Sequence, residues 1–258
     1  MQGFHLSVPA VFRTLAVGTV AILMSAPASY AALVDFSAFS DADRTAINGV
    51  KSTLTTNGIT ATALKYFGST GYSNNEPWVT LWIRKDPGDH GLGVCTEGLR
   101  SCGGNPFNPL VEARGDANEL GNNHRDEVIR LERSEGQVWS DFWVSSLDTK
   151  SGPGRESGRF YWSNDSRANL NALSWITFNQ DLLDWTASKD EGSIFEYLMA
   201  KGFDRTAKFV FFRADITNGT DNDYLVYKAG TTAVPVPPPL LLLGSALAAL
   251  SIFPRRKG

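Results

Sequence analysis

The residue types that usually build catalytic and metal centres are scarce in this chain of 258 residues. With two cysteines and three histidines, it is short of the nitrogen and sulfur ligands of the common zinc sites. No serine stands in a Gly-x-Ser-x-Gly motif, the sequence signal of a nucleophile elbow. Acidic pairs that resemble glycosidase carboxylates are present, but any acidic secreted domain offers as many. These absences argue against an enzyme. A Ser-His-Asp triad that uses His90 or His124 remains an alternative.

Excess positive charge is also absent. The net charge is −3, and four of the basic residues lie in the terminal segments, which leaves 20 basic against 27 acidic residues between them. No segment interleaves basic with aromatic residues, as nucleic-acid-binding surfaces do, so nucleic acid is excluded as a partner. No sequence repeat indicates a propeller or a solenoid. The 42% hydrophobic and 20% charged content is that of a folded globular protein.

The N-terminal segment has the pattern of a secretory signal peptide. Arg13 supplies a positive charge, Leu15–Met24 is an apolar run, and small residues follow. Ten helical residues rise only ~15 Å, too little for a membrane anchor. We predict cleavage after Ala31, with Ser29 and Ala31 at the positions that signal peptidase reads; cleavage after Ala28 is the second choice. The sequence therefore predicts an exported protein with an N-terminal signal helix.

Export places the two cysteines in an oxidising compartment. Cys95 and Cys102 are close in sequence and no other cysteine is available, so one small-loop disulfide is the simplest interpretation. A zinc site would have to add His90 and His124, and it is the weaker alternative. We therefore predict a Cys95–Cys102 disulfide.

The C-terminal segment changes composition abruptly. A proline-rich stretch cannot continue a sheet, and the apolar run Leu240–Phe253 follows it. As a helix this run would rise ~21 Å, which is short for a membrane span, and snorkelling of the flanking arginines extends it. Arg255, Arg256 and Lys257 at its end would keep the C-terminus in the cytoplasm and the preceding domain outside. We predict a C-terminal transmembrane helix; a buried core helix is the alternative.

This three-part tail resembles the PEP-CTERM sorting signals that exosortases recognise in Gram-negative bacteria. Pro235, Val236 and Pro237 stand where the family has Pro-Glu-Pro, which is similar to its Val-Pro-x-Pro variant. The resemblance implies a precursor held in the inner membrane, facing the periplasm, that an exosortase cuts near the proline motif. It also implies delivery to the cell surface or extracellular matrix, since members of the family are typically associated with exopolysaccharide and biofilm formation.

Between the two ends, short apolar or alternating runs separated by turn residues predict β-strands. The expected strands are Ile59–Phe67, Trp78–Arg84, Glu127–Glu132, Val138–Leu147, Arg159–Ser163, Leu173–Phe178, Lys208–Ala214 and Asp223–Lys228. Helix signals are confined to Asp41–Val50, with Asp41 as a possible cap, and Ser193–Lys201. The pattern predicts an all-β fold, an antiparallel two-sheet β-sandwich that is jelly-roll-like.

The middle of the chain also resembles the β-rich ectodomain found in many PEP-CTERM proteins. The residues that carry this resemblance are Gly91–Cys95 (the GLGVC stretch), Asp126–Leu131, Trp143–Asp148 and Asp223–Val226. It implies a compartment and a fold, and no reaction. The expected organisation is a signal peptide at 1–31, the β-sandwich at 32–230, a proline-rich linker with the sorting motif at 231–239, and the transmembrane helix with its basic tail at 240–258.

Acidic loops raise the hypothesis of a calcium site. Asp86, Asp89, Asp126 and Glu127 supply oxygen ligands on Gly- and Asn-rich segments, and calcium takes six to eight such ligands. No EF-hand spacing is present, and Asp and Asn also begin turns by bonding their own backbone. Turn formation is the preferred interpretation and calcium the alternative; no other cofactor is expected.

The seven tryptophans raise the hypothesis of a glycan-binding face. Trp143 and Trp175 sit among alternating apolar residues, so we expect them in the core. Trp185 has polar neighbours and is the predicted ligand-binding residue. The primary hypothesis is a non-enzymatic surface or matrix protein whose partners are signal peptidase, an exosortase, the inner membrane and extracellular polysaccharide. A carbohydrate-binding module is the first alternative and a secreted hydrolase the second.

Overall fold

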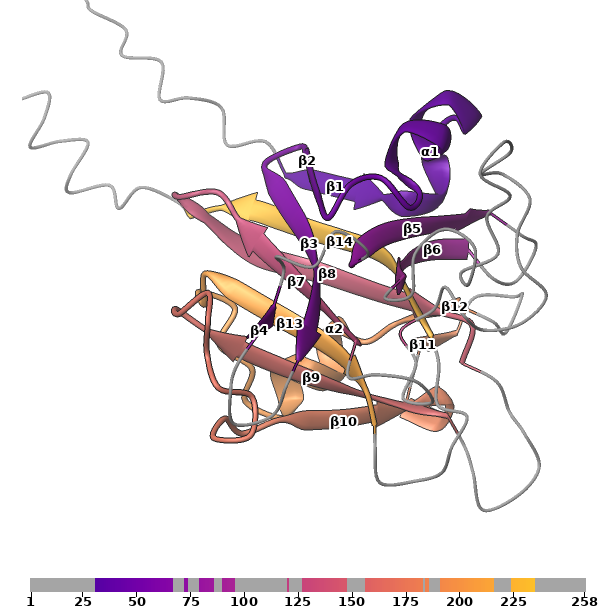
Figure 1. Cartoon of the computed structure of the whole chain (residues 1–258). Helices are drawn as coiled ribbons and strands as arrows, with labels where there is room; N and C mark the ends of the chain where they lie inside the picture. The colour runs from indigo at the N-terminus through magenta and orange to yellow at the C-terminus, as the bar shows by residue number, and fades with distance from the viewer. Residues whose placement is uncertain are drawn as a thin grey trace, which may run out of the picture.

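The protein is seen in a computed structural model that describes residues 31–66, 72–73, 79–85, 90–95, 120, 127–147, 156–182, 184–185, 191–215 and 224–234. Within these ranges the chain forms two antiparallel β-sheets that lie one above the other, with few helices (Figure 1). The predicted all-β, two-sheet sandwich is therefore confirmed.

The first sheet, sheet A, has the strand order β11–β12–β8–β14–β6–β5, and β1 also pairs with β14. Both β6 and β1 are antiparallel to β14: β6 pairs at Val226, and β1 further along at Lys228–Thr231. The strands are β1 (Ala32–Asp35), β5 (Thr80–Lys85), β6 (His90–Cys95), β8 (Gln137–Ser145), β11 (Asp184–Trp185), β12 (Glu191–Ser193) and β14 (Leu225–Ala233).

The second sheet, sheet B, has the strand order β10–β9–β13–β7–β3–β2, and β4 also pairs with β3. Its central strand β13 pairs along its whole length with β9 on one side, and with β7 on the other. The strands are β2 (Thr53–Thr56), β3 (Ile59–Tyr66), β4 (Tyr72–Ser73), β7 (Glu127–Arg133), β9 (Ser157–Ser163), β10 (Ile176–Asn179) and β13 (Phe209–Ala214).

The apolar side chains between the two sheets form one core. Because successive side chains of a strand point to opposite faces, about every second residue of a strand faces the other sheet. Phe142 of β8 lies at the centre, with its ring 5.3 Å from that of Phe160 and 5.6 Å from that of Phe212 on the opposite sheet. Gly158 leaves room for its cross-strand partner Phe178, since a Cβ at Gly158 would lie 2.2 Å from the Phe178 ring.

A second, smaller core lies on the outer face of sheet B. Tyr161 and Phe211 point away from the main core, and residues of the connection between β9 and β10, including Ala168 and Leu170, cover them. The Tyr66 hydroxyl fixes this connection, because it donates to Asn169 Oδ1 at 2.7 Å. Sheet B is therefore apolar on both faces over part of its area.

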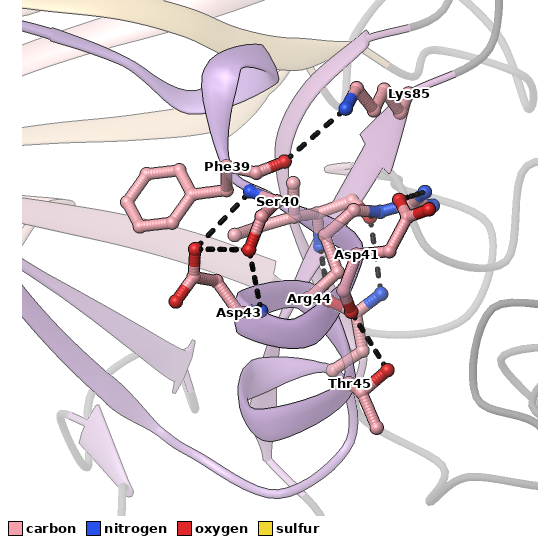
Figure 2. A network of polar contacts seen from close by, with 9 residues as sticks. Phe39, Ser40, Asp41, Asp43, Arg44, Thr45 and Lys85 are labelled. Atoms are coloured by element: carbon pink, nitrogen blue, oxygen red, sulfur yellow. Dashed lines mark hydrogen bonds and ion pairs between the residues drawn. The ribbon is translucent and has the colours of Figure 1, made fainter.

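The helix α1 (Asp41–Ile47) covers the edge of β5 in sheet A (Figure 1). Ser40 and Asp43 form a capping box that begins the helix (Figure 2). At the C-cap of α1, the Asn48 side chain accepts from the Ile83 N–H at 2.7 Å and donates to the Ile83 carbonyl at 3.1 Å. The Asn48 amide thus makes the two backbone hydrogen bonds that a neighbouring strand would make to Ile83. This blocks the pairing of another chain with the edge of β5 at this residue.

We predict that Asn48→Ala lowers the free energy of unfolding by about 2 kcal/mol, because it leaves the buried Ile83 N–H without a partner. Arg44 still reaches the Ile83 carbonyl, so only one backbone group is orphaned. Urea unfolding measures the change. Thr45→Ala is the control, since the Thr45 hydroxyl only bonds the exposed helix backbone; equal effects of the two substitutions would contradict the edge-closing role of Asn48.

Several sequence predictions need correction at the element ends. The cap of α1 is Ser40 rather than Asp41, because Ser40 accepts the N3 amide hydrogen bond. The strand predicted from Leu173 begins at Ile176, and β14 runs to Ala233, past the boundary expected at residue 230. The second predicted helix is α2 (Phe195–Ala200). Short 3-10 helices span Phe36–Ala38 and Gln180–Leu182.

No helix within the described ranges has the length and apolar content needed to cross a membrane. The two predicted terminal helices, including Leu240–Phe253, lie outside those ranges.

Candidate functional site

Most of the predicted site residues lie outside the described residues. These are the sorting residues Pro235, Val236, Pro237, Arg255, Arg256 and Lys257, the calcium candidates Asp86, Asp89 and Asp126, and Ser29, Cys102 and His124. Trp185 is placed as a residue of β11, paired with Gly192, but its side chain is not described. Ala31 is exposed and directly precedes β1.

Among the predicted calcium and disulfide residues, Glu127 and Cys95 have a described environment. Glu127 is buried at the start of β7, and within the described residues no group of three metal-ligating side chains forms. Cys95 is buried beside Trp82 and is not a free thiol. Because Cys102 lies outside the described residues, the Cys95–Cys102 pairing stays a prediction, as does calcium binding.

The most exposed described tryptophan is Trp175, which directly precedes the edge strand β10. It is 46% exposed, which corrects the expectation that it belongs to the core. The alternation of apolar residues led to that expectation, yet Ile176 and Phe178 face the core and Trp175 faces outward. A large aromatic ring therefore lies open to solvent on the outer face of sheet B.

A buried ion pair supports the inner side of this ring. The Arg159 guanidinium lies 4.9 Å from the centre of the Trp175 ring, and its Nη2 is 2.7 Å from Asp215 Oδ1. Both charged side chains are more than nine-tenths buried. The ring of Tyr161 lies 6.3 Å from that of Trp175. Because a buried, paired guanidinium has little freedom, the ring that rests on it is held in one orientation.

Polar side chains lie next to Trp175 on the same face of β10. Thr177 and Asn179 lie two and four residues further on, so they share its face of the strand. Thr177 stands opposite Arg159 and Asn179 opposite Ser157. The Asn179 side-chain oxygen has no hydrogen-bond partner, although it is shielded from solvent. We name this set of Trp175, Thr177, Asn179, Arg159 and Asp215 the tryptophan face.

A second group of polar and aromatic side chains lies on the outer face of sheet A. The His90 Nε2 atom is 2.7 Å from Glu191 Oε2, and the His90 ring packs edge-on against Tyr227 at 4.4 Å. Trp143 donates from Nε1 to Asp141 at 2.8 Å. Trp143 was also expected in the core, and its place on the outer face corrects that expectation. We name these residues, with Lys228 and Asp35, the sheet A patch.

Gly91 explains how His90 reaches this face. Leu92 and Val94 point into the main core, so in a regular strand His90 would point there as well. Gly91 has a φ of +145°, a conformation that side-chain-bearing residues rarely adopt, and a Cβ there would lie 2.8 Å from the Val226 carbonyl oxygen. The irregularity at Gly91 directs the His90 ring to the outer face.

Lys228 is the cation of the sheet A patch. Its Nζ atom lies 4.1 Å from the centre of the Tyr227 ring, 5.2 Å from that of Trp143, and 3.6 Å from Asp35 Oδ2. Burial by itself lowers the pKa of this ammonium, but Tyr227 and the carboxylates of Asp35 and Glu191 outweigh it and raise the pKa above its ordinary value. Lys228 therefore stays charged over the physiological pH range.

Comparison of the chain with protein-family models, with curated proteins and with solved structures found no match. The fold and the side-chain geometry therefore carry the functional argument.

Tyr224, a buried tyrosine close to Asp215 and Arg213, gives a test of this region. Burial raises the pKa of Tyr224 well above 10, and Tyr161 and Asp215 add to the shift, while Arg213 opposes it. The folded state thus favours the neutral phenol, so this contribution to stability is complete below pH ~10 and is lost as pH rises further.

We predict that the wild-type protein loses up to about 1.4 kcal/mol of unfolding free energy per pH unit above pH ~10 through Tyr224 alone. In Tyr224→Phe this part of the loss should disappear, so the stability curve should fall less steeply. Urea unfolding between pH 9 and 11 measures both curves. Tyr197→Phe is the matched control, because Tyr197 of α2 is only partly buried and its hydroxyl donates to the Thr177 carbonyl. Parallel curves for wild type and Tyr224→Phe would contradict the prediction.

Proposed function

We propose that this chain is an exported, non-enzymatic protein of the cell surface or extracellular matrix, and that it binds polysaccharide through the tryptophan face. The observation that carries the proposal is the exposed Trp175 ring, held from behind by the buried Arg159–Asp215 pair. Aromatic rings that combine an apolar face with adjacent polar groups are the usual platform for ligands that are apolar on one side and hydroxylated at the rim.

The proposal follows from what the tryptophan face offers a sugar. The exposed Trp175 ring leaves apolar surface in contact with water, which is unfavourable. A sugar that stacks on the ring would remove this surface from water. Thr177 and Asn179 follow along the same strand face and supply hydroxyl and amide groups to bond sugar hydroxyls. Because Arg159 is neutralised by Asp215, the face carries no net positive charge of its own. A neutral polysaccharide therefore fits it better than an acidic one.

The compartment belongs to the same proposal. The signal sequence and the PEP-CTERM-like tail support export, transient anchoring in the inner membrane and processing by signal peptidase and an exosortase. The proposal also includes the N-terminal signal helix, the C-terminal transmembrane helix and the jelly-roll-like connectivity of the strands. A surface or matrix location would bring the tryptophan face into contact with exopolysaccharide. No cofactor and no catalytic role are included.

We predict that Trp175→Ala abolishes polysaccharide binding at the tryptophan face. Native electrophoresis in gels containing hydroxyethylcellulose, barley β-glucan, galactomannan, dextran or alginate measures it as retardation of the band. The wild type should be retarded by at least one neutral polymer, Trp175→Ala should lose most of the retardation, and Trp175→Phe should keep a larger part of it. Leu182→Ala is the control, because Leu182 is also an exposed apolar residue and is 41% exposed. No retardation of the wild type by any polymer would overturn the binding proposal.

Export and processing have their own test. We predict that protein recovered from its native host and fractionated into membrane, periplasm and medium has a mass lacking residues 1–31 and the segment after the Pro235–Pro237 motif. Intact-mass spectrometry measures it. A product that keeps Leu240–Phe253 and stays in the membrane fraction would contradict delivery to the matrix.

A further inference from the structure

We infer that the sheet A patch is a second polysaccharide-binding face, so that one copy of this protein cross-links two polysaccharide strands. The inference rests on the proposed function, because it assigns the ligand class of the tryptophan face to a second, separate surface. The observations behind it are the composition of the patch, the incomplete burial of its charged groups and its position on the opposite side of the molecule.

The sheet A patch brings together residues from five strands of sheet A. Bulges in β14 against β8 and the irregular Gly91 make this convergence possible, because they break the regular alternation of side chains. The members are Asp35 of β1, His90 of β6, Asp141 and Trp143 of β8, Glu191 of β12, and Tyr227 and Lys228 of β14.

Stability gives little reason for this cluster. The Lys228–Asp35 pair, at 3.6 Å, remains partly exposed, with 22% and 31% of the two side chains accessible. Partly exposed ion pairs contribute little to folding, since solvent screens them and ordering the side chains costs entropy. The His90–Glu191 pair is likewise accessible, at 20% and 15%. Part of each of these four side chains therefore remains exposed to a ligand.

The chemistry of the patch fits a neutral or amino sugar. Lys228 and His90 donate hydrogen bonds, and the carboxylates of Asp35, Asp141 and Glu191 accept them from hydroxyl or ammonium groups. Three carboxylates against one lysine repel a uronic acid. Because Lys228 covers the Tyr227 ring, the ligand would be held by hydrogen bonds rather than by stacking on that ring. The two faces thus bind the same polymer class by different contacts.

The two faces lie on opposite sides of the sandwich. The two sheets lie one above the other (Figure 1). The Phe142 core lies between them, the tryptophan face on the outer side of sheet B and the sheet A patch on the outer side of sheet A. Packed sheets are separated by about 10 Å, and the outer side chains add to that thickness. One straight segment of polysaccharide cannot contact both faces, so simultaneous binding joins two segments.

Agglutination of polysaccharide-coated beads tests the inference. The beads carry the neutral polymer that gives the largest retardation in the gel assay, and the protein is confirmed as a monomer by light scattering. The variants are Trp175→Ala, the double variant Lys228→Gln with Glu191→Gln, and Leu182→Ala as control, each checked for native near-ultraviolet circular dichroism and unchanged melting. We expect the wild type and the control to agglutinate the beads, and either face variant to need at least tenfold more protein.

The outcomes separate the inference from the proposed function. The double variant should still be retarded in the gel within about twofold of the wild type, because its tryptophan face is intact. If it agglutinates the beads as well as the wild type does, the second face is refuted while the proposed function stands. If the wild type proves dimeric, or binds without agglutinating, cross-linking by one copy is refuted. If the wild type binds no polymer, the proposed function fails first.

Discussion

The packing of the Phe142 ring against the opposite sheet is the contact on which the rest of the structure depends. Phe142 belongs to sheet A, and it touches Phe160 and Phe212 of sheet B and Phe203 after α2. Such ring pairs add to the hydrophobic effect, since each ring buries a large area. Both sheets direct the apolar residues of one face to this core. The alternate residues of each strand therefore form the outer faces.

Those outer faces differ because of what covers them. On sheet B the connection between β9 and β10 supplies apolar residues that cover Tyr161 and Phe211, and Trp175 lies where this connection ends. On sheet A the irregular backbone at Gly91 and in β14 gathers polar residues from several strands. The proposed binding surfaces therefore follow from the connection that covers part of sheet B and from the backbone irregularities of sheet A.

The strands that fill the core were predictable, and the residues of the two faces were not. Runs such as Phe209–Ala214 alternate between two buried faces and are apolar except for Arg213, so their pattern indicates a strand. Trp175 was misassigned because the apolar alternation continues across the turn before β10. Glu191 was missed because β12 is only three residues long and its partner His90 is 101 residues away. Local patterns record burial, whereas long-range polar contacts need the tertiary structure.

The position of the chain ends bears on how two such faces could work on a tethered protein. Ala32 at the start of β1 pairs with Thr231 near the end of β14, so the chain enters and leaves the described domain at one end of sheet A (Figure 1). An anchor that follows residue 234 would attach to this end of the sandwich and to neither broad face. Since the tryptophan face and the sheet A patch lie on the two broad faces, both would stay accessible to polysaccharide in the proposed anchored precursor as well as in the proposed released domain.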